Sequence, residues 1–196
     1  MTHGFAETLQ GNRPTGGLFI NAIAAGSSWT RWTEGGEGAF TIIPNFLLTG
    51  ILAILTGLAI IIWSVGFVHK RRGPLVYLLL FIVLFLVGGG IGQVAFFIPA
   101  WAVATRIHKP LTWWRRVLPA GMRRGLAKAW PWLLRAASLL ILIALVIATF
   151  GYIPGVQDMD QVLDITLSLV GLSLGFFLLA FVAGFAYDIE QGMQAV

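Results

Sequence analysis

Gln93 and the glycines that precede it are the residues of this sequence whose types and spacing best suit a binding or permeation site. They lie in an apolar run, residues 74–106, that carries no charge before Arg106. Glycine lets another helix or a substrate approach the backbone closely, and polar side chains at membrane depth are costly and often line a pathway. We therefore predict a substrate or permeation site at Gly88, Gly89, Gly90, Gly92 and Gln93. In the alternative interpretation, Gln93 only bonds to a neighbouring helix.

A second group of residues combines aromatic and basic side chains between residues 107 and 132. Tryptophan favours the head-group region of a membrane, and each lysine or arginine near an anionic leaflet contributes about 1 kcal/mol to binding. The pattern is typical of a helix lying on a membrane surface. We therefore predict contacts with anionic lipid head groups by Trp113, Trp114, Arg115, Arg116, Arg123, Arg124 and Lys128. In the alternative interpretation, this block only anchors the topology.

The other polar residues form no catalytic or metal-binding pattern. The histidines lack a second ligand at a spacing that suits a metal ion or haem: His3, His69 and His108. Residues 171–175 read G-x-S-x-G, but a nucleophile elbow needs a strand before the serine, whereas this motif lies within an apolar helical stretch. Asp188 and Glu190 close a predicted helix, where carboxylates are more often solvated than paired for acid–base chemistry. We predict no catalytic residue, metal or cofactor.

Composition places the chain among integral membrane proteins. It has 196 residues, of which 58% are hydrophobic and only 11% charged, and its mean hydropathy is +0.86. Soluble domains contain about 25% charged residues. The length suits one compact membrane domain, and the absence of cysteine excludes disulfides and thiol chemistry.

The charges are strongly segregated along the chain. Of the 13 lysine and arginine residues, all except Arg13 and Arg31 lie within residues 69–135, which contain no acidic residue. Nucleic acid is a poor partner for this block because apolar segments flank it on both sides, so anionic lipid is the nearer partner. Since lysine and arginine concentrate in cytoplasmic loops, we place the basic loop 106–135 on the cytoplasmic side.

The hydrophobic pattern predicts an all-α, polytopic helical bundle. A polar N-terminal region, residues 1–40, precedes a transmembrane domain, residues 41–196. Within the first region, residues 16–29 are expected to form an interfacial or re-entrant helix, with Trp29 and Trp32 at head-group depth, or else an irregular loop. The second region contains the interfacial amphipathic loop described above and four membrane-embedded segments, at about residues 41–68, 74–106, 133–152 and 162–187.

The second of these segments is too long for one perpendicular crossing. Its residues, 74 to 106, would form a helix of about 50 Å, against a hydrocarbon core of about 30 Å. The glycine cluster and Pro99 favour a bend or a break. We rank a single crossing first and a re-entrant hairpin, broken at residues 88–90, second. The single crossing puts the basic loop 69–73 outside, whereas the hairpin puts both basic loops on the cytoplasmic side.

Three functions are compatible with these features. The first is a small transporter or channel-like protein with Gln93 and the glycines at its site. The second is a non-catalytic subunit or scaffold of a larger membrane complex, which docks partner helices through small residues. The third and weakest is a lipid-active enzyme, because no intramembrane acid–base pair is apparent. Membrane lipids, a second copy of the chain or partner membrane subunits are the expected partners.

Overall fold

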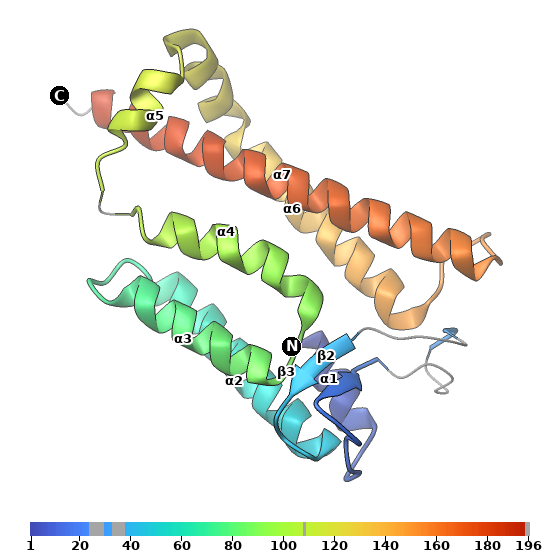
Figure 1. Ribbon diagram of the computed structural model, residues 1–196. Coiled ribbons are helices and arrows are strands. Elements are labelled where there is room, and N and C mark those ends of the chain that lie inside the picture. Colours follow the sequence, from blue (N-terminus) through green and yellow to red (C-terminus); the bar gives the residue numbers. More distant parts are fainter. Residues whose placement is uncertain (24–29, 33–37, 108, 195–196) are drawn as a thin grey trace. The chain divides into compact units, whose positions relative to one another are not determined.

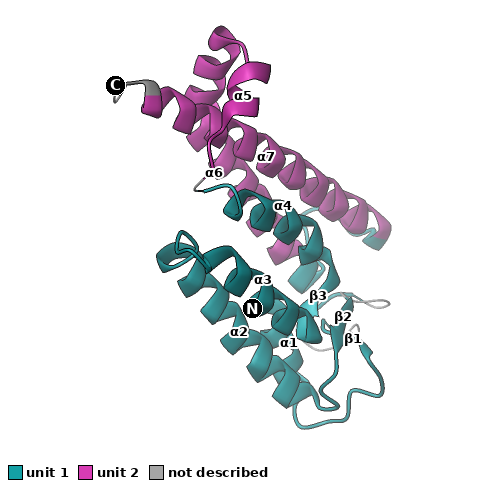
Figure 2. Ribbon diagram, turned by 60° about the vertical axis from the view of Figure 1, so that its left-hand side comes forward, with its two compact units in different colours: residues 1–107, 148–159 teal, residues 108–147, 160–196 magenta. Residues whose placement is uncertain are grey.

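The computed structural model describes residues 1–23, 30–32, 38–107 and 109–194 of the chain (Figure 1). It is mostly helical, at 71%, as predicted, although the described residues also include three short strands that were not predicted. The chain divides into two compact units, residues 1–107 with 148–159 and residues 108–147 with 160–196 (Figure 2).

The first unit begins with helix α1 (Thr2–Leu9), which packs against the long apolar helix α2 (Phe46–Gly66). A Cβ built on Gly4 would lie 2.7 Å from the carbonyl oxygen of Gly50, and one built on Gly50 would lie 2.5 Å from that of Gly4. Only residues without side chains allow such a close approach. Gly57 likewise accommodates the first residue of the chain, so α1 lies along roughly the first three turns of α2.

Three short antiparallel strands form a small sheet in the order β1–β2–β3. They are β1 (Phe19–Asn21), β2 (Gly38–Thr41) and β3 (Val87–Gly90). Ala39 pairs with Gly90 and Thr41 with Val87, so β3 holds one residue more than β2 between these pairs, which is a β-bulge. Gly88 lies in this bulge with φ of 100°, a conformation that glycine adopts without steric strain.

Strand β1 replaces the interfacial helix predicted for residues 16–29 in the part of that segment that is described. The backbone of Ile20 pairs with that of Ala39, and both side chains are buried in a small cluster beside Phe46. Pairing with β2 therefore satisfies backbone groups that a helix would have bonded internally. Residues 24–29, including Trp29, lie outside the described residues.

Helix α2 begins later than predicted, at Phe46 instead of about residue 41. Asn45 is the N-cap, and its side chain accepts a hydrogen bond from the Leu48 amide at 3.1 Å, which satisfies one of the amide groups left free at a helix start. After the helix ends at Gly66, the indole of Trp63 donates to the carbonyl of Gly73 at 2.9 Å and closes the basic turn between them.

The long apolar stretch is broken at its glycines. Helix α3 (Gly73–Leu86) leads into β3, a 3₁₀ turn η1 (Ile91–Gln93) and helix α4 (Val94–Ala104). The two helices fold back on each other (Figure 1). The ring of Phe97 stacks on that of Phe81, with centroids 3.5 Å apart. The break predicted at the glycines is therefore confirmed, and residues 74–106 form no single continuous helix. A bulged strand uses the glycines that would otherwise weaken a helix.

The second unit is built on two long helices that follow the short helix α5 (Thr112–Val117). Helix α6 (Ala120–Phe150) begins well before the residue 133 that was predicted, and helix α7 (Met159–Gln194) also exceeds its predicted bounds. Residues 120–132 are thus the first turns of α6, not a separate interfacial loop. Proline is tolerated at Pro131 at the cost of one backbone hydrogen bond.

Specific side chains hold α6 and α7 together in antiparallel order. Near the middle of α7, the hydroxyl of Ser173 donates to the carbonyl of Ala137 at 2.8 Å. The indole of Trp130 stacks on the ring of Tyr187, with centroids 5.0 Å apart. The buried hydroxyl of Ser173 thus has a packing role, as expected for a G-x-S-x-G match within a helix.

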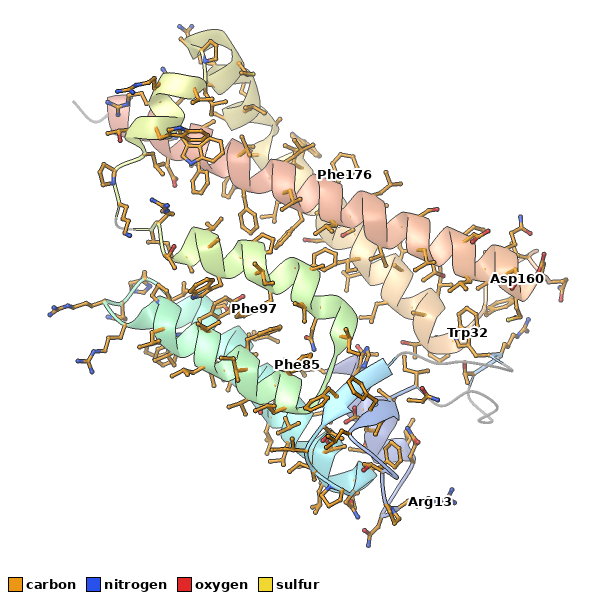
Figure 3. The ribbon with its side chains drawn as sticks, viewed as in Figure 1. Arg13, Trp32, Phe85, Phe97, Asp160 and Phe176 are labelled. Atoms are coloured by element: carbon orange, nitrogen blue, oxygen red, sulfur yellow. The ribbon has the colours of Figure 1, made fainter. Side chains whose placement is uncertain are left out.

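The C-terminal end of α6 belongs to the first unit, where residues 31 and 32 cap it. The backbone amide of Arg31 donates to the carbonyl of Phe150 at 2.9 Å, and the indole of Trp32 donates to that of Ala148 at 2.8 Å (Figure 3). These bonds satisfy carbonyl groups that a helix end leaves free. Gly151, with φ of 63°, ends the helix in the left-handed conformation typical of such caps.

Three of the described helices are long and apolar enough to cross a membrane, and they span Phe46–Gly66, Ala120–Phe150 and Met159–Gly192. At most 22% of the most apolar stretch of each is buried, so their apolar surfaces face outward, as expected where lipid is the solvent. With 14 and 11 residues, α3 and α4 measure about 21 and 17 Å and are too short to span alone. The second predicted segment, residues 74–106, is therefore not a single spanning helix.

Candidate functional site

The glycine strand β3 is the centre of the candidate site, because two side chains of α1 lie directly against it. A Cβ built on Gly88 would lie 2.5 Å from a carboxyl oxygen of Glu7, and one built on Gly90 would overlap the imidazole ring of His3. All residues of β3 are buried. The absence of side chains on Gly88 and Gly90 is therefore what admits the carboxyl and the imidazole.

Helix α1 presents these two side chains together because they are four residues apart. Residues i and i+4 lie on the same face of an α-helix, so His3 and Glu7 point in one direction. The contact between Gly4 and Gly50 fixes the position of α1 on α2. The same helix is tied to the sheet by Gln10, whose side-chain amide donates to the backbone carbonyls of Asn21 and Ala22 at 3.0 Å each.

Glu7 is the most unusual residue of the site. Its exposed fraction is 0%, and neither carboxyl oxygen has a hydrogen-bond partner among the described residues. Burial raises the pKa of Glu7 from 4.5 to about 8, although the nearby amino group of Met1 opposes this rise. Burial disfavours a charged carboxylate when no partner compensates for lost hydration, and so favours the neutral acid.

The side chain of Gln93 also lies against strand β3, at Gly89. A Cβ built on Gly89 would lie 2.7 Å from the side-chain nitrogen of Gln93. The amide of Gln93 is thus part of the glycine cluster. The site therefore combines a carboxyl, an imidazole and an amide around a backbone that has no side chains.

A buried hydroxyl network fixes β2 and β3 to α2 beside this site. The hydroxyl of Thr49 donates to the carbonyl of Val87 at 2.8 Å. It therefore accepts from the hydroxyl of Thr41, 2.6 Å away, and Thr41 in turn accepts from the amide of Ile43 at 3.0 Å. With all these polar groups satisfied, the network holds the strand rigidly against the spanning helix.

The structure brings together most, but not all, of the residues predicted for the site. Gly88, Gly89, Gly90 and Gln93 lie together, whereas Gly92 is exposed, with nothing within 4 Å of a Cβ built on it. Glu7 and His3 were not predicted as site residues, because they lie in the polar N-terminal region, far in sequence from the glycines. The available signal was their i, i+4 spacing around Gly4, which a reading of α1 as an amphipathic helix would have used.

The site has no arrangement typical of a metal centre. Within the described ranges, no three histidine, aspartate or glutamate side chains come together where they could hold a metal ion. The chemistry that the site offers is therefore proton transfer and hydrogen bonding by one acid, one imidazole and one amide.

The residues predicted to contact lipid head groups do not behave as one set. Arg123 is only 8% exposed, and its Nε donates to a carboxylate oxygen of Glu190 at 2.6 Å. The ring of Trp114 packs against that of Phe185, with centroids 5.1 Å apart. Arg123 is thus an internal partner of α7, which corrects its predicted lipid role. The remaining members are exposed: Trp113, Arg115, Arg116, Arg124 and Lys128.

The composition, the fold and this site define a membrane-embedded helical protein. Its buried carboxyl packs beside a helix that is long and apolar enough to cross a membrane. No known protein family matches the chain, and no significant similarity to a curated protein or to a solved structure was found.

Proposed function

We propose that this protein is a small membrane transporter or channel-like protein whose site lies at Glu7, His3, Gln93 and the glycine strand. The observation that supports this most is the buried, unpartnered carboxyl of Glu7 against residues without side chains. Ionisable groups at membrane depth are costly and commonly belong to a substrate, ion or proton pathway. Irregular backbone such as β3 is tolerated at that depth only within protein or along a cavity.

The positions of the small residues in the fold also favour transport over a scaffold role. Gly88 and Gly92 have the GxxxG spacing of a helix-docking motif, but they lie in β3 and η1, not in a helix. The close contact between Gly4 and Gly50 is internal to the chain. Gly88, Gly4 and Gly50 therefore serve contacts inside the chain instead of a partner helix.

The test is a flux assay on purified protein reconstituted into liposomes. Stopped-flow light scattering with small neutral solutes, and a voltage-sensitive dye with sodium, potassium or chloride gradients, measure solute and ion flux respectively. We expect a flux that depends on the protein and falls at least tenfold in Gln93→Leu, at unchanged thermal stability. Gly92→Ala is the matched control, because its Cβ would point into open space. A flux equal in empty and protein-containing liposomes would contradict the proposal.

We further propose that the basic surface of α5 and the start of α6 binds anionic lipid on the cytoplasmic side. Two tryptophans here are unusually exposed, Trp113 at 60% and Trp132 at 68%, as expected at a membrane interface. The hairpin of α3 and α4 brings the basic ends of both helices to one side, which favours a re-entrant hairpin with both basic loops cytoplasmic. Single cysteine replacements of the exposed residues Arg71 and Gln157 test this. Only the cysteine at position 157 should be labelled from outside the cell.

A further inference from the structure

We propose that Glu7 is a proton-binding residue, held as the neutral acid at neutral pH and able to release its proton to water. This inference deepens the proposed transport function and rests on it, because it makes the proton an ion that the site handles. In the step itself, the O–H bond of the carboxylic acid breaks, the proton leaves to water, and a carboxylate remains on Glu7.

The geometry around Glu7 favours the neutral acid. Its side chain is completely buried, and both oxygens lack hydrogen-bond partners in the part of the chain that the structure describes. A carboxylate in such a place would forfeit its hydration without compensation, whereas a protonated carboxyl loses much less. Gly88 lies so close to the carboxyl that no residue with a side chain would fit at position 88.

The elements around Glu7 contain few charges that could stabilise a carboxylate. Helices α2, α3 and α4 and strands β2 and β3 contain no aspartate, glutamate, lysine, arginine or histidine. The titratable side chain of these elements is Tyr77, whose ring packs against that of Phe97 with centroids 4.7 Å apart. Helix α1 itself contributes His3, and the amino group of Met1 lies nearby.

The amino group of Met1 does not remove the preference for the neutral acid. It would stabilise a carboxylate on Glu7, but burial lowers the pKa of this amino group as well. Burial remains the larger influence on Glu7 and raises the pKa of its carboxyl to about 8. Titration near neutral pH suits a group that must both bind and release a proton under physiological conditions.

The experiment observes the proton directly and needs no transport substrate. Full-length protein labelled with ¹³C-glutamate is reconstituted into phosphatidylcholine vesicles, and infrared spectra are recorded between pH 5 and pH 10. We expect a carboxylic-acid C=O band of glutamate at pH 7 that is lost with a midpoint near pH 8. The band should be absent from Glu7→Gln and retained in Glu190→Gln, since Glu190 is ion-paired with Arg123.

Two results would overturn the inference. One is a wild-type spectrum at pH 7 in which all glutamates are ionised. The other is a neutral-acid band that persists at equal intensity in Glu7→Gln. If that variant does not fold, the wild-type pH titration alone decides between bound proton and carboxylate. Failure of the flux assay with a positive infrared result would instead reject transport while leaving the proton-binding residue in place.

Discussion

Replacing Glu7 by glutamine should make the stability of this protein much less dependent on pH. Glutamine has nearly the same shape as a protonated glutamate but cannot ionise. Since the pKa of Glu7 is raised in the fold, the folded protein binds the proton more tightly than the unfolded chain does. The stabilisation from this proton is therefore complete below pH 4.5 and is lost as pH rises towards and through 8.

The size of the effect follows from the two pKa values. The interval between the ordinary 4.5 and the folded value of about 8, at about 1.4 kcal/mol per pH unit, amounts to about 5 kcal/mol. This is an upper limit, because local opening to water would relieve the buried charge at high pH. For a chain of this length, such a loss lowers the melting temperature by about 10–20 °C.

The assay is thermal unfolding in detergent at pH 5, 7 and 9, followed by tryptophan fluorescence. We expect wild-type protein and Glu7→Gln to melt at similar temperatures at pH 5, and the variant to melt at a clearly higher temperature at pH 9. Titratable groups that do not contact Glu7 are common to both proteins and cancel in the difference. The amino group of Met1, which interacts with the Glu7 carboxylate, is part of the effect being measured. If the two melting curves change in parallel with pH, or if Glu7→Gln is destabilised equally at every pH, the burial argument is wrong.

Three further predictions use matched variants. Gly90→Ala should lower stability by about 1–3 kcal/mol because its methyl group would displace the imidazole of His3. The control Gly92→Ala should be neutral or slightly stabilising, and equal melting temperatures of the two variants would contradict this. Arg123→Gln should lower stability by about 3 kcal/mol, because it leaves the largely buried carboxylate of Glu190 without its ion-pair partner. Arg124 is exposed, so Arg124→Gln should change stability by less than about 0.5 kcal/mol. Anionic vesicles should pull down less protein, most clearly at low salt, after combined glutamine replacement of Arg115, Arg116 and Lys128.

The membrane character of the protein could be read from the sequence because it depends on local composition. Long apolar runs with few charges lead to helices that can cross a membrane, and α2, α6 and α7 follow this rule. The glycines at residues 88–90 also indicated a break in the helix, and strand β3 confirms it. Helix ends were harder to predict. The basic segment 120–132 forms the start of α6 although it is only weakly apolar, because tertiary contacts such as that between Trp130 and Tyr187 stabilise it.

The candidate site, in contrast, depends on contacts between residues far apart in the chain. Nothing local indicates that residues 3 and 7 meet residues 88 and 90, because this contact requires α1 to dock on α2 through glycines and β3 to pair with β2. The same holds for Arg123, whose sequence neighbours resemble a lipid-binding surface but whose partner is 67 residues away. The sequence by itself thus determined the membrane character of the protein, since this follows from how apolar each segment is. Tertiary structure alone decided which polar groups are buried and left without partners, because burial depends on every element that packs around a residue.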